Sequence, residues 1–247
     1  MLKRIIDICI SISALIILLP VFMVITVLIR ITSRGPAIFK QQRAGKNGIP
    51  FTFYKFRTMK VDTDPYGNSP KEAHDVRLTA VGRFLRETSL DELPQLVNIL
   101  KGDMSLVGPR PLYVSQMAEW TEYQKRRLLV RPGLTGLAQI SGRAALTREA
   151  KLALDVQYVN NASFYSDIKI ILATFKHVFQ RTAIYETNYS ESPGFGSAQP
   201  PTDDRPVQLS VESRSLSEAE TVDGQSVLPP VESRSLSEAE TNEDKNE

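Results

Sequence analysis

The longest apolar run of the chain lies close to its N-terminus. Residues Ile8–Ile29 carry no charge, and 18 of these 22 residues are apolar. A run of this length and composition is typical of a segment that enters a lipid bilayer. The run is too long for the apolar region of a cleavable signal peptide, and no small-x-small cleavage site follows it. We therefore expect a phospholipid membrane to be one partner of this chain.

The residues around this run favour a re-entrant helix over a spanning one. Lys3 and Arg4 precede the run and several basic residues follow it from Arg30 onward, so the positive-inside rule places both ends in the cytoplasm. Pro20 divides the run into arms of 12 and 9 residues. At helical rise these arms are about 18 and 14 Å long, roughly half of a ~30 Å hydrocarbon core. We predict that residues 1–34 form a re-entrant helix hairpin broken at Pro20; a kinked spanning helix is the alternative.

A β-hairpin is predicted directly after the membrane segment. The segments Ala37–Arg43 and Phe51–Thr58 are rich in β-branched and aromatic residues, and the Asn47-Gly48 pair between them tolerates positive φ. The hairpin is also basic, and could hold anionic groups or simply present a solvated face. Its basic residues are Lys40, Arg43, Lys46, Lys55, Arg57 and Lys60.

The rest of the folded part is predicted to be mainly helical. Apolar residues recur at spacings of three and four over Val81–Leu100, until Gly102 ends the pattern. A second helix is predicted over Tyr113–Val130, and a third, amphipathic one over Ser163–Tyr185 that suits either a core or a membrane surface. The predicted fold class is therefore α+β, mainly helical, with a small β-hairpin and amphipathic interfacial helices.

Charge and composition separate a basic body from an acidic tail. Residues 1–186 hold 26 Lys plus Arg against 15 acidic residues, whereas residues 187–247 hold 4 against 13. Only 14 of the 61 tail residues are apolar, so we predict a disordered C-terminal tail. The sequence VESRSLSEAET occurs twice in it, at Val211–Thr221 and Val231–Thr241. A recent tandem duplication explains this repeat; a docking or phosphorylation segment is the alternative.

The scarcity of cysteine and histidine excludes several kinds of site. Cys9 is the only cysteine, so intramolecular disulfides and multi-cysteine metal sites are excluded. His74 and His177 are the only histidines, which argues against a histidine-rich metal centre. Any catalysis must therefore use other groups.

Adjacent carboxylates and nearby arginines provide such groups. Asp91 and Glu92 offer one carboxylate as a nucleophile and another as a ligand for a hard cation such as Mg²⁺. Arg110 stands between two prolines, which stiffen the backbone of a side chain suited to phosphate. Together these are the parts of a phosphoryl-transfer site. A capping box made by Ser89 and Glu92 at a helix start is the structural alternative. The arginines that could complete an anion pocket are Arg86, Arg131 and Arg143.

Several motifs, in order along the chain, resemble the bacterial sugar transferase family of small monotopic phosphoglycosyl transferases. The resemblance covers Lys3–Ile184, and it is specific because the motifs are separate and occur in the right order. They are KRIID, the apolar segment with its central proline, SRGPAIFKQQRAGKNGIPFTFYKFRTM, RLTAVGRFLRETSLDELPQLVNILKGDMSLVGPRPL, RPGLTGLAQISGR and DVQYVNNASFYSDIKII.

The resemblance implies transfer of a sugar 1-phosphate from a nucleotide diphosphate sugar, usually a UDP-sugar, to undecaprenyl phosphate, with release of UMP. It implies that Asp91 is the nucleophile and forms a covalent phosphosugar intermediate, and that Glu92 helps to bind Mg²⁺. Arg110 and Arg143 match positions near bound phosphate, with Arg86 close by. It also implies that residues 35–186 form a catalytic domain facing the cytoplasm at the bacterial inner membrane, with no nucleic-acid partner. Homo-oligomerisation is left open.

One departure and two alternatives accompany this hypothesis. The family breaks its re-entrant helix at a Ser-Pro pair, whereas this chain has Leu19-Pro20, which lacks a hydroxyl for the freed carbonyl. One alternative function is a membrane-anchored basic protein that binds anionic lipid or nucleic acid. The other is a glycosyl transferase that moves the sugar alone and releases UDP.

Overall fold

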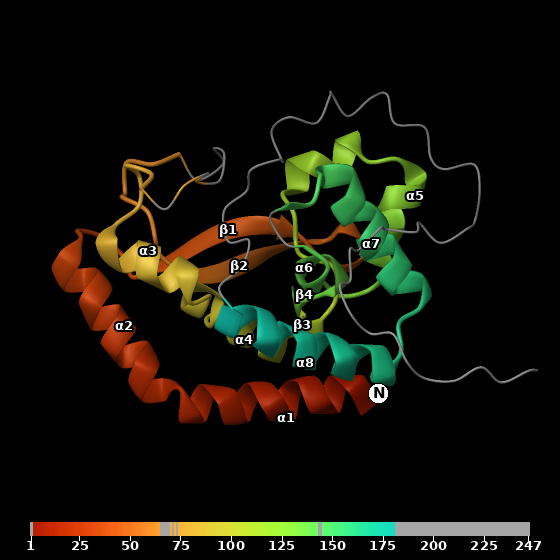
Figure 1. Cartoon of the computed structure of the whole chain (residues 1–247), viewed down its shortest axis with the longest axis horizontal. Coiled ribbons are helices and arrows are strands. Elements are labelled where there is room, and N and C mark those ends of the chain that lie inside the picture. The colour runs from red at the N-terminus through yellow and green to blue at the C-terminus, as the bar shows by residue number, and fades with distance from the viewer. Residues whose placement is uncertain (1, 65–69, 71, 73, 143–144, 181–247) are drawn as a thin grey trace, which may run out of the picture. The chain divides into compact units, whose positions relative to one another are not determined.

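A computed structural model describes residues 2–64, 70, 72, 74–142 and 145–180 (Figure 1). All of them belong to one compact unit, Met1–Pro206. The predicted tail, residues 187–247, lies outside the described residues, and so does Arg143. Within them the fold is α+β and mainly helical, as predicted, and it contains two small sheets, of which only the hairpin was expected.

The N-terminal apolar run forms two helices that meet at a bend. Helix α1 spans Leu2–Ile17 and helix α2 spans Leu19–Thr32, with an angle of 61° between them. The bend falls at Leu18, because Pro20 takes a place in the first turn of α2, where its missing N–H breaks no helical hydrogen bond. Among the described residues no single helix is both long and apolar enough to cross a bilayer, whereas this bent pair meets those criteria together.

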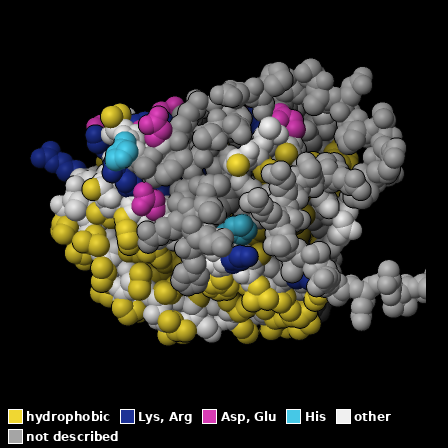
Figure 2. Space-filling model, viewed as in Figure 1, with side chains coloured by type: hydrophobic (Ala, Val, Ile, Leu, Met, Phe, Trp, Pro, Cys, Tyr) yellow, Lys and Arg dark blue, Asp and Glu magenta, His cyan; other side chains and the backbone are white. Residues whose placement is uncertain are grey.

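Both helices bury one face against the rest of the unit and expose an apolar face. Ile25 and Ile29 of α2 are buried beside Phe56 and Leu85, and α1 runs alongside helix α4, Gln95–Lys101 (Figure 1). Hydrophobic side chains gather on the outer surface of α2 and α1 (Figure 2). Exposed apolar residues of this surface include Leu2, Ile5, Ile16, Ile17, Leu19, Met23, Val24, Val27 and Ile31.

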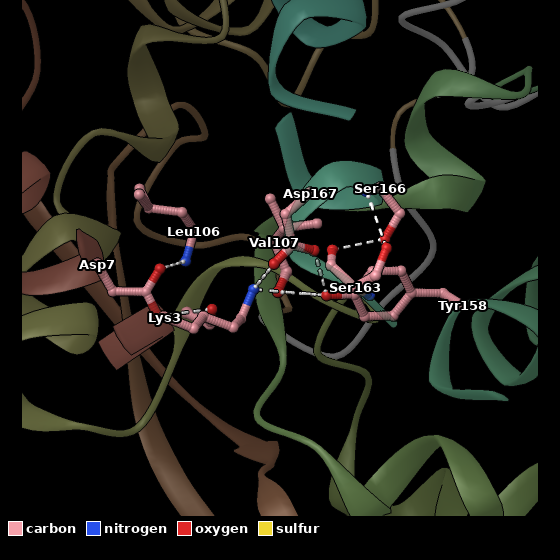
Figure 3. A network of polar contacts seen from close by, with 9 residues as sticks. Lys3, Asp7, Leu106, Val107, Tyr158, Ser163, Ser166 and Asp167 are labelled. Atoms are coloured by element: carbon pink, nitrogen blue, oxygen red, sulfur yellow. Dashed lines mark hydrogen bonds and ion pairs between the residues drawn. The ribbon is translucent and has the colours of Figure 1, made fainter. Parts of the chain in front are cut away.

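A polar network fastens α1 to the body of the protein (Figure 3). The carboxylate of Asp7 accepts hydrogen bonds from Ser105 Oγ at 2.8 Å and from the Leu106 N–H at 3.1 Å. Lys3 forms an ion pair with Asp167 of helix α8, Phe164–Gln180. The α1 face that carries Asp7 is therefore packed against the body, with Lys3 at its edge.

The predicted β-hairpin is confirmed. Strand β1, Ile38–Ala44, pairs antiparallel with strand β2, Pro50–Phe56, in a register that runs from Ile38 opposite Phe56 to Ala44 opposite Pro50. The turn between them, η1, covers Lys46–Gly48. Its residues Asn47 and Gly48 have φ values of 58° and 75°, as their residue types predict.

The helical pattern over residues 81–100 is broken into three pieces. Helix α3 spans Ala80–Glu87, a 3₁₀ turn η2 spans Leu90–Glu92, and α4 follows. Ser89 adopts a left-handed conformation with φ 58°, which ends the first helix and redirects the chain. Gly102, also left-handed with φ 93°, ends α4 as predicted.

Residues 102–140 contain a parallel strand pair that periodicity did not predict. Strand β3, Ser105–Val107, lies beside strand β4, Gly133–Thr135, and the short helix α6, Leu137–Ile140, follows. The two backbones are close just beyond β3: a Cβ on Gly133 would lie 2.1 Å from the Gly108 nitrogen. Only glycine fits there.

The single helix predicted over Tyr113–Val130 is wrong. The segment forms η3 (Val114–Glu119), α5 (Glu122–Lys125) and η4 (Arg126–Leu129). Trp120 is extended and 4% exposed, so burial of its ring interrupts the helix, and Thr121 starts the next one with a capping box.

Helices α7, Arg148–Asn160, and α8 complete the core. The largest apolar cluster joins β2, α4, β3, α7 and α8 around fully buried side chains. Its buried members are Phe51, Phe53, Leu96, Ile99, Met104, Leu106, Val107, Tyr158 and Ile170.

Asn98 of α4 joins this helix to the edge of β2. Its side chain accepts from the Tyr54 N–H at 3.1 Å and donates to the Thr52 carbonyl at 2.7 Å. We expect Asn98→Ala to lower the free energy of unfolding by about 2–4 kcal/mol, because two strand groups lose their partners in a buried place. Urea unfolding measures this. The matched control Val97→Ala, at a half-exposed neighbouring position, should cost less than about 1 kcal/mol; equal losses would contradict the role of Asn98.

Candidate active site

The two candidate carboxylates lie in the 3₁₀ turn between α3 and α4. Asp91 is 7% exposed, whereas Glu92 is partly accessible. The capping box predicted for Ser89 and Glu92 is wrong, since Ser89 is left-handed and its side chain makes no capping hydrogen bond. The turn thus points the Asp91 carboxylate inward and leaves that of Glu92 accessible to another part of the chain.

Glu92 meets Arg110 across the site. Nη2 of Arg110 donates to Oε1 of Glu92 at 2.6 Å, and the Arg110 side chain is still 47% exposed. Arg110 follows β3, in a Gly-Pro-Arg-Pro segment that the close approach of β3 and β4 holds in place. The structure therefore brings together Glu92 and Arg110, residues 18 apart in the chain.

The charges around Asp91 are mixed in sign. Burial, and after it the negative charge of Glu92, raises the pKa of Asp91 to about 6. Three cations oppose this rise, those of Lys55, Arg86 and Arg110. The sequence-predicted residues Asp91, Glu92, Arg86 and Arg110 therefore share one electrostatic environment.

Lys55 is the site residue that sequence reasoning did not single out. It lies on β2 opposite Phe39, and its ammonium is 5.2 Å from the centroid of that ring. Burial lowers the pKa of Lys55 to about 8, while Asp91 works against that fall. The sequence placed Lys55 only among the basic residues of the hairpin, because nothing in its spacing showed which of them faces the carboxylates.

Arg131 and Arg143, the other two arginines predicted for the anion pocket, are not seen to join this site among the described residues. Arg131 donates through Nε to the Gly102 carbonyl at 2.7 Å, so it supports the C-terminal end of α4. Arg143 lies outside the described residues, and its predicted phosphate contact stays a prediction.

The two carboxylates suit a magnesium ion that also contacts a substrate. Among the described residues there is no group of three or more His, Cys, Asp or Glu side chains able to hold a metal by themselves. Mg²⁺ commonly uses only one or two protein carboxylates, and takes water and substrate phosphate as its other ligands. The repulsion between Asp91 and Glu92 is also what a divalent cation would relieve. The residues present fit Mg²⁺, with Glu92 as the accessible ligand.

Taken together, the site combines a buried carboxylate, an accessible carboxylate and three cations. The cations suit a substrate with several phosphate oxygens. A carboxylate held among them can attack phosphorus, and the cations can stabilise the charge that develops on the phosphoryl oxygens.

Comparison with known proteins relates this chain to one protein family. The model of the family described as "Bacterial sugar transferase" matches residues 1–181. The "Uncharacterized sugar transferase EpsL" of Bacillus subtilis is 46% identical over 188 residues, which cover 76% of this chain and 92% of that protein.

Longer relatives match over part of their length. The "Undecaprenyl-phosphate galactose phosphotransferase" of Salmonella typhimurium is 42% identical over 200 residues, covering 74% of this chain and 42% of that protein. The "UDP-glucose:undecaprenyl-phosphate glucose-1-phosphate transferase" of Klebsiella pneumoniae is 41% identical over 190 residues, covering 73% and 41%. The chain thus spans less than half of these longer relatives. The family match extends over most of the chain, and we conclude that this protein belongs to the bacterial sugar transferase family.

Proposed function

We propose that this protein transfers a sugar 1-phosphate from a UDP-sugar to undecaprenyl phosphate. The observation that carries the proposal is the buried carboxylate of Asp91, set beside Glu92 and among Lys55, Arg86 and Arg110. The names of two relatives support the reaction class, since one is a galactose phosphotransferase and the other a glucose-1-phosphate transferase, both acting on undecaprenyl phosphate. The product, undecaprenyl-diphosphate-sugar, would begin the synthesis of a surface polysaccharide or glycoconjugate.

The reaction proceeds in two displacements at one phosphorus atom. A carboxylate oxygen of Asp91 attacks the β-phosphorus of the donor, the bond from that phosphorus to the bridging oxygen breaks, and UMP leaves. A phosphate oxygen of undecaprenyl phosphate then attacks the same phosphorus, and the bond to Asp91 breaks to restore the carboxylate. The acceptor is already an anion, so neither step requires a dedicated general base.

The other residues of the site bind the substrate phosphates and orient one another. Arg110 and Lys55 bind the diphosphate oxygens, and Arg86 adds positive potential close to Asp91. Glu92 keeps Arg110 directed at the site through their ion pair and would hold Mg²⁺. When bound, Mg²⁺ supplies charge neutralisation on the phosphoryl oxygens.

The alternative functions fit the site less well. A basic protein that only binds anionic lipid or nucleic acid gives no reason to bury Asp91 next to a second carboxylate, where it weakens the positive potential. A transferase that moves the sugar alone would release UDP instead of UMP. The nucleotide product separates these possibilities.

We further propose that α1 and α2 enter the cytoplasmic leaflet of the inner membrane and return. Their outer surface is apolar (Figure 2), while the inner face of α1 is fixed to the body by Asp7 and Lys3. Helix α8 also exposes apolar side chains and would lie at the membrane interface, where the lipid acceptor resides. Those exposed side chains are Phe164, Tyr165, Ile168, Leu172 and Phe175.

Asp91→Asn tests the proposed nucleophile. We expect this substitution to reduce Mg²⁺-dependent UMP release from UDP-glucose or UDP-galactose by ~10³-fold or more, because an amide cannot form the intermediate. The control Asp62→Asn changes an exposed carboxylate outside the site and should leave the rate within twofold, about the scatter of such assays. Release of UDP by the native protein, or full activity in Asp91→Asn, would contradict the mechanism.

The pH profile tests the charges of Asp91 and Lys55. Attack needs the ionised carboxylate, so kcat/KM should fall as pH drops through about 6, the raised pKa of Asp91. Phosphate binding uses the protonated lysine, so kcat/KM should also fall as pH rises through about 8, the lowered pKa of Lys55. Lys55→Arg keeps its charge at high pH and should remove the alkaline limb alone. An alkaline limb unchanged in Lys55→Arg would show that another group titrates.

Cysteine labelling tests the membrane arrangement. In a Cys9→Ser background, single cysteines at Leu2 and Arg34 should react with a membrane-impermeant maleimide in inverted vesicles and stay unlabelled in intact spheroplasts. Both ends then lie on the cytoplasmic side. A cysteine at Leu19, beside the bend, should be protected from the charged reagent in both preparations. Labelling of Arg34→Cys from outside would instead establish a spanning arrangement.

A further inference from the structure

The backbone around Arg110 is held at three consecutive carbonyl groups. The Pro109 carbonyl accepts from the Gly133 N–H at 2.9 Å, that of Arg110 accepts from Arg127 Nη2 at 2.5 Å, and that of Pro111 accepts from Arg43 Nη1 at 3.4 Å. The prolines on either side of Arg110 fix φ and offer no N–H of their own. Side chains and β4 therefore determine where the Arg110 backbone lies.

The middle contact comes from a buried arginine. Arg127 of η4 is 3% exposed, and its guanidinium lies 4.9 Å from the centroid of the Trp120 ring. Nε and Nη2 of Arg127 both donate to Oδ2 of Asp155 in α7, at 3.1 and 2.7 Å. Asp155 is likewise 3% exposed. Asp155 and the indole ring therefore fix the direction of the guanidinium that meets Arg110.

A stabilising role alone does not account for this arrangement. The attraction between two buried charges often does no more than offset the free energy lost when both leave water. A buried ion pair is therefore weak evidence for a stabilising role. Here the two nitrogens share one oxygen of Asp155, while the other oxygen, Oδ1, is buried with no hydrogen-bond partner among the described residues. Arg127 and Asp155 therefore do not form the usual bidentate pair, in which each nitrogen donates to a different carboxylate oxygen. The arrangement leaves Nη2 of Arg127 directed at the Arg110 carbonyl.

We propose that Arg127, oriented by Asp155, is a positioning residue for Arg110. It fixes the backbone from which the Arg110 side chain reaches Glu92 and the donor diphosphate. The inference rests on the proposed function, because that function gives Arg110 a phosphate to bind. Nη2 of Arg127 donates both to Asp155 and to the Arg110 carbonyl, while Nε adds a second bond to Asp155 and the planar group lies over the Trp120 ring. Lysine keeps the positive charge but has neither the Nε donor nor the plane that fix the direction of Nη2.

A double-mutant cycle tests this role. We expect Arg127→Lys, which keeps the positive charge beside Asp155, to lower kcat/KM for the UDP-sugar by ~10–100-fold, the range typical of supporting residues. The matched control Arg126→Lys changes the adjacent exposed arginine, which bonds Asn160, and should stay within about twofold. In an Arg110→Ala background, Arg127→Lys should cost less than about twofold, because the residue through which it acts is gone.

Two measurements separate positioning from folding and from failure of the proposed reaction. Thermal unfolding of the four proteins of the cycle gives the folded fraction by which each rate is corrected. An equal loss from Arg127→Lys in both backgrounds, or no loss after this correction, would overturn the positioning role while UMP release by the native protein upholds the proposed function. Absence of UMP release from the native protein with every UDP-sugar tried would overturn both.

Discussion

The site depends on one electrostatic balance, the burial of the Asp91 carboxylate beside a second carboxylate. Desolvation and the charge of Glu92 both disfavour its ionised form, and only nearby cations make that form accessible near neutral pH. Those cations come from three separate parts of the fold: Lys55 from β2, Arg86 from α3 and Arg110 from the segment after β3. The hairpin, the α3–α4 turn and the parallel strand pair must therefore pack correctly before the site exists.

The bent helix pair is connected to the same framework. Asp7 of α1 accepts from Ser105 and Leu106 on β3, and Tyr158 donates to the carbonyl of Val107 on the same strand at 3.2 Å (Figure 3). Strand β3 leads directly into the segment that carries Arg110. The three-residue strand β3 thus connects the α1–α2 pair with the segment that carries Arg110.

Local chemistry made part of this fold predictable. The hairpin followed from the residue types at its turn, Asn47 and Gly48, and the end of α4 followed from Gly102, since each has a backbone preference independent of its surroundings. The left-handed Ser89 and the position of Lys55 near Asp91 were not predicted, because both depend on tertiary packing and strand register. Residue types and family motifs singled out the candidate carboxylates and arginines, but only the structure shows which of them meet.

Trapping the covalent intermediate tests the role of Asp91 most directly. The native protein would be incubated with Mg²⁺ and a UDP-sugar that it turns over, without undecaprenyl phosphate, then quenched, digested and analysed by mass spectrometry. The mechanism predicts a hexose-phosphate adduct on the peptide that contains Asp91, and its disappearance when undecaprenyl phosphate is added before the quench. Turnover with no adduct on that peptide, or with an adduct on another residue, would contradict the assignment of Asp91 as the nucleophile.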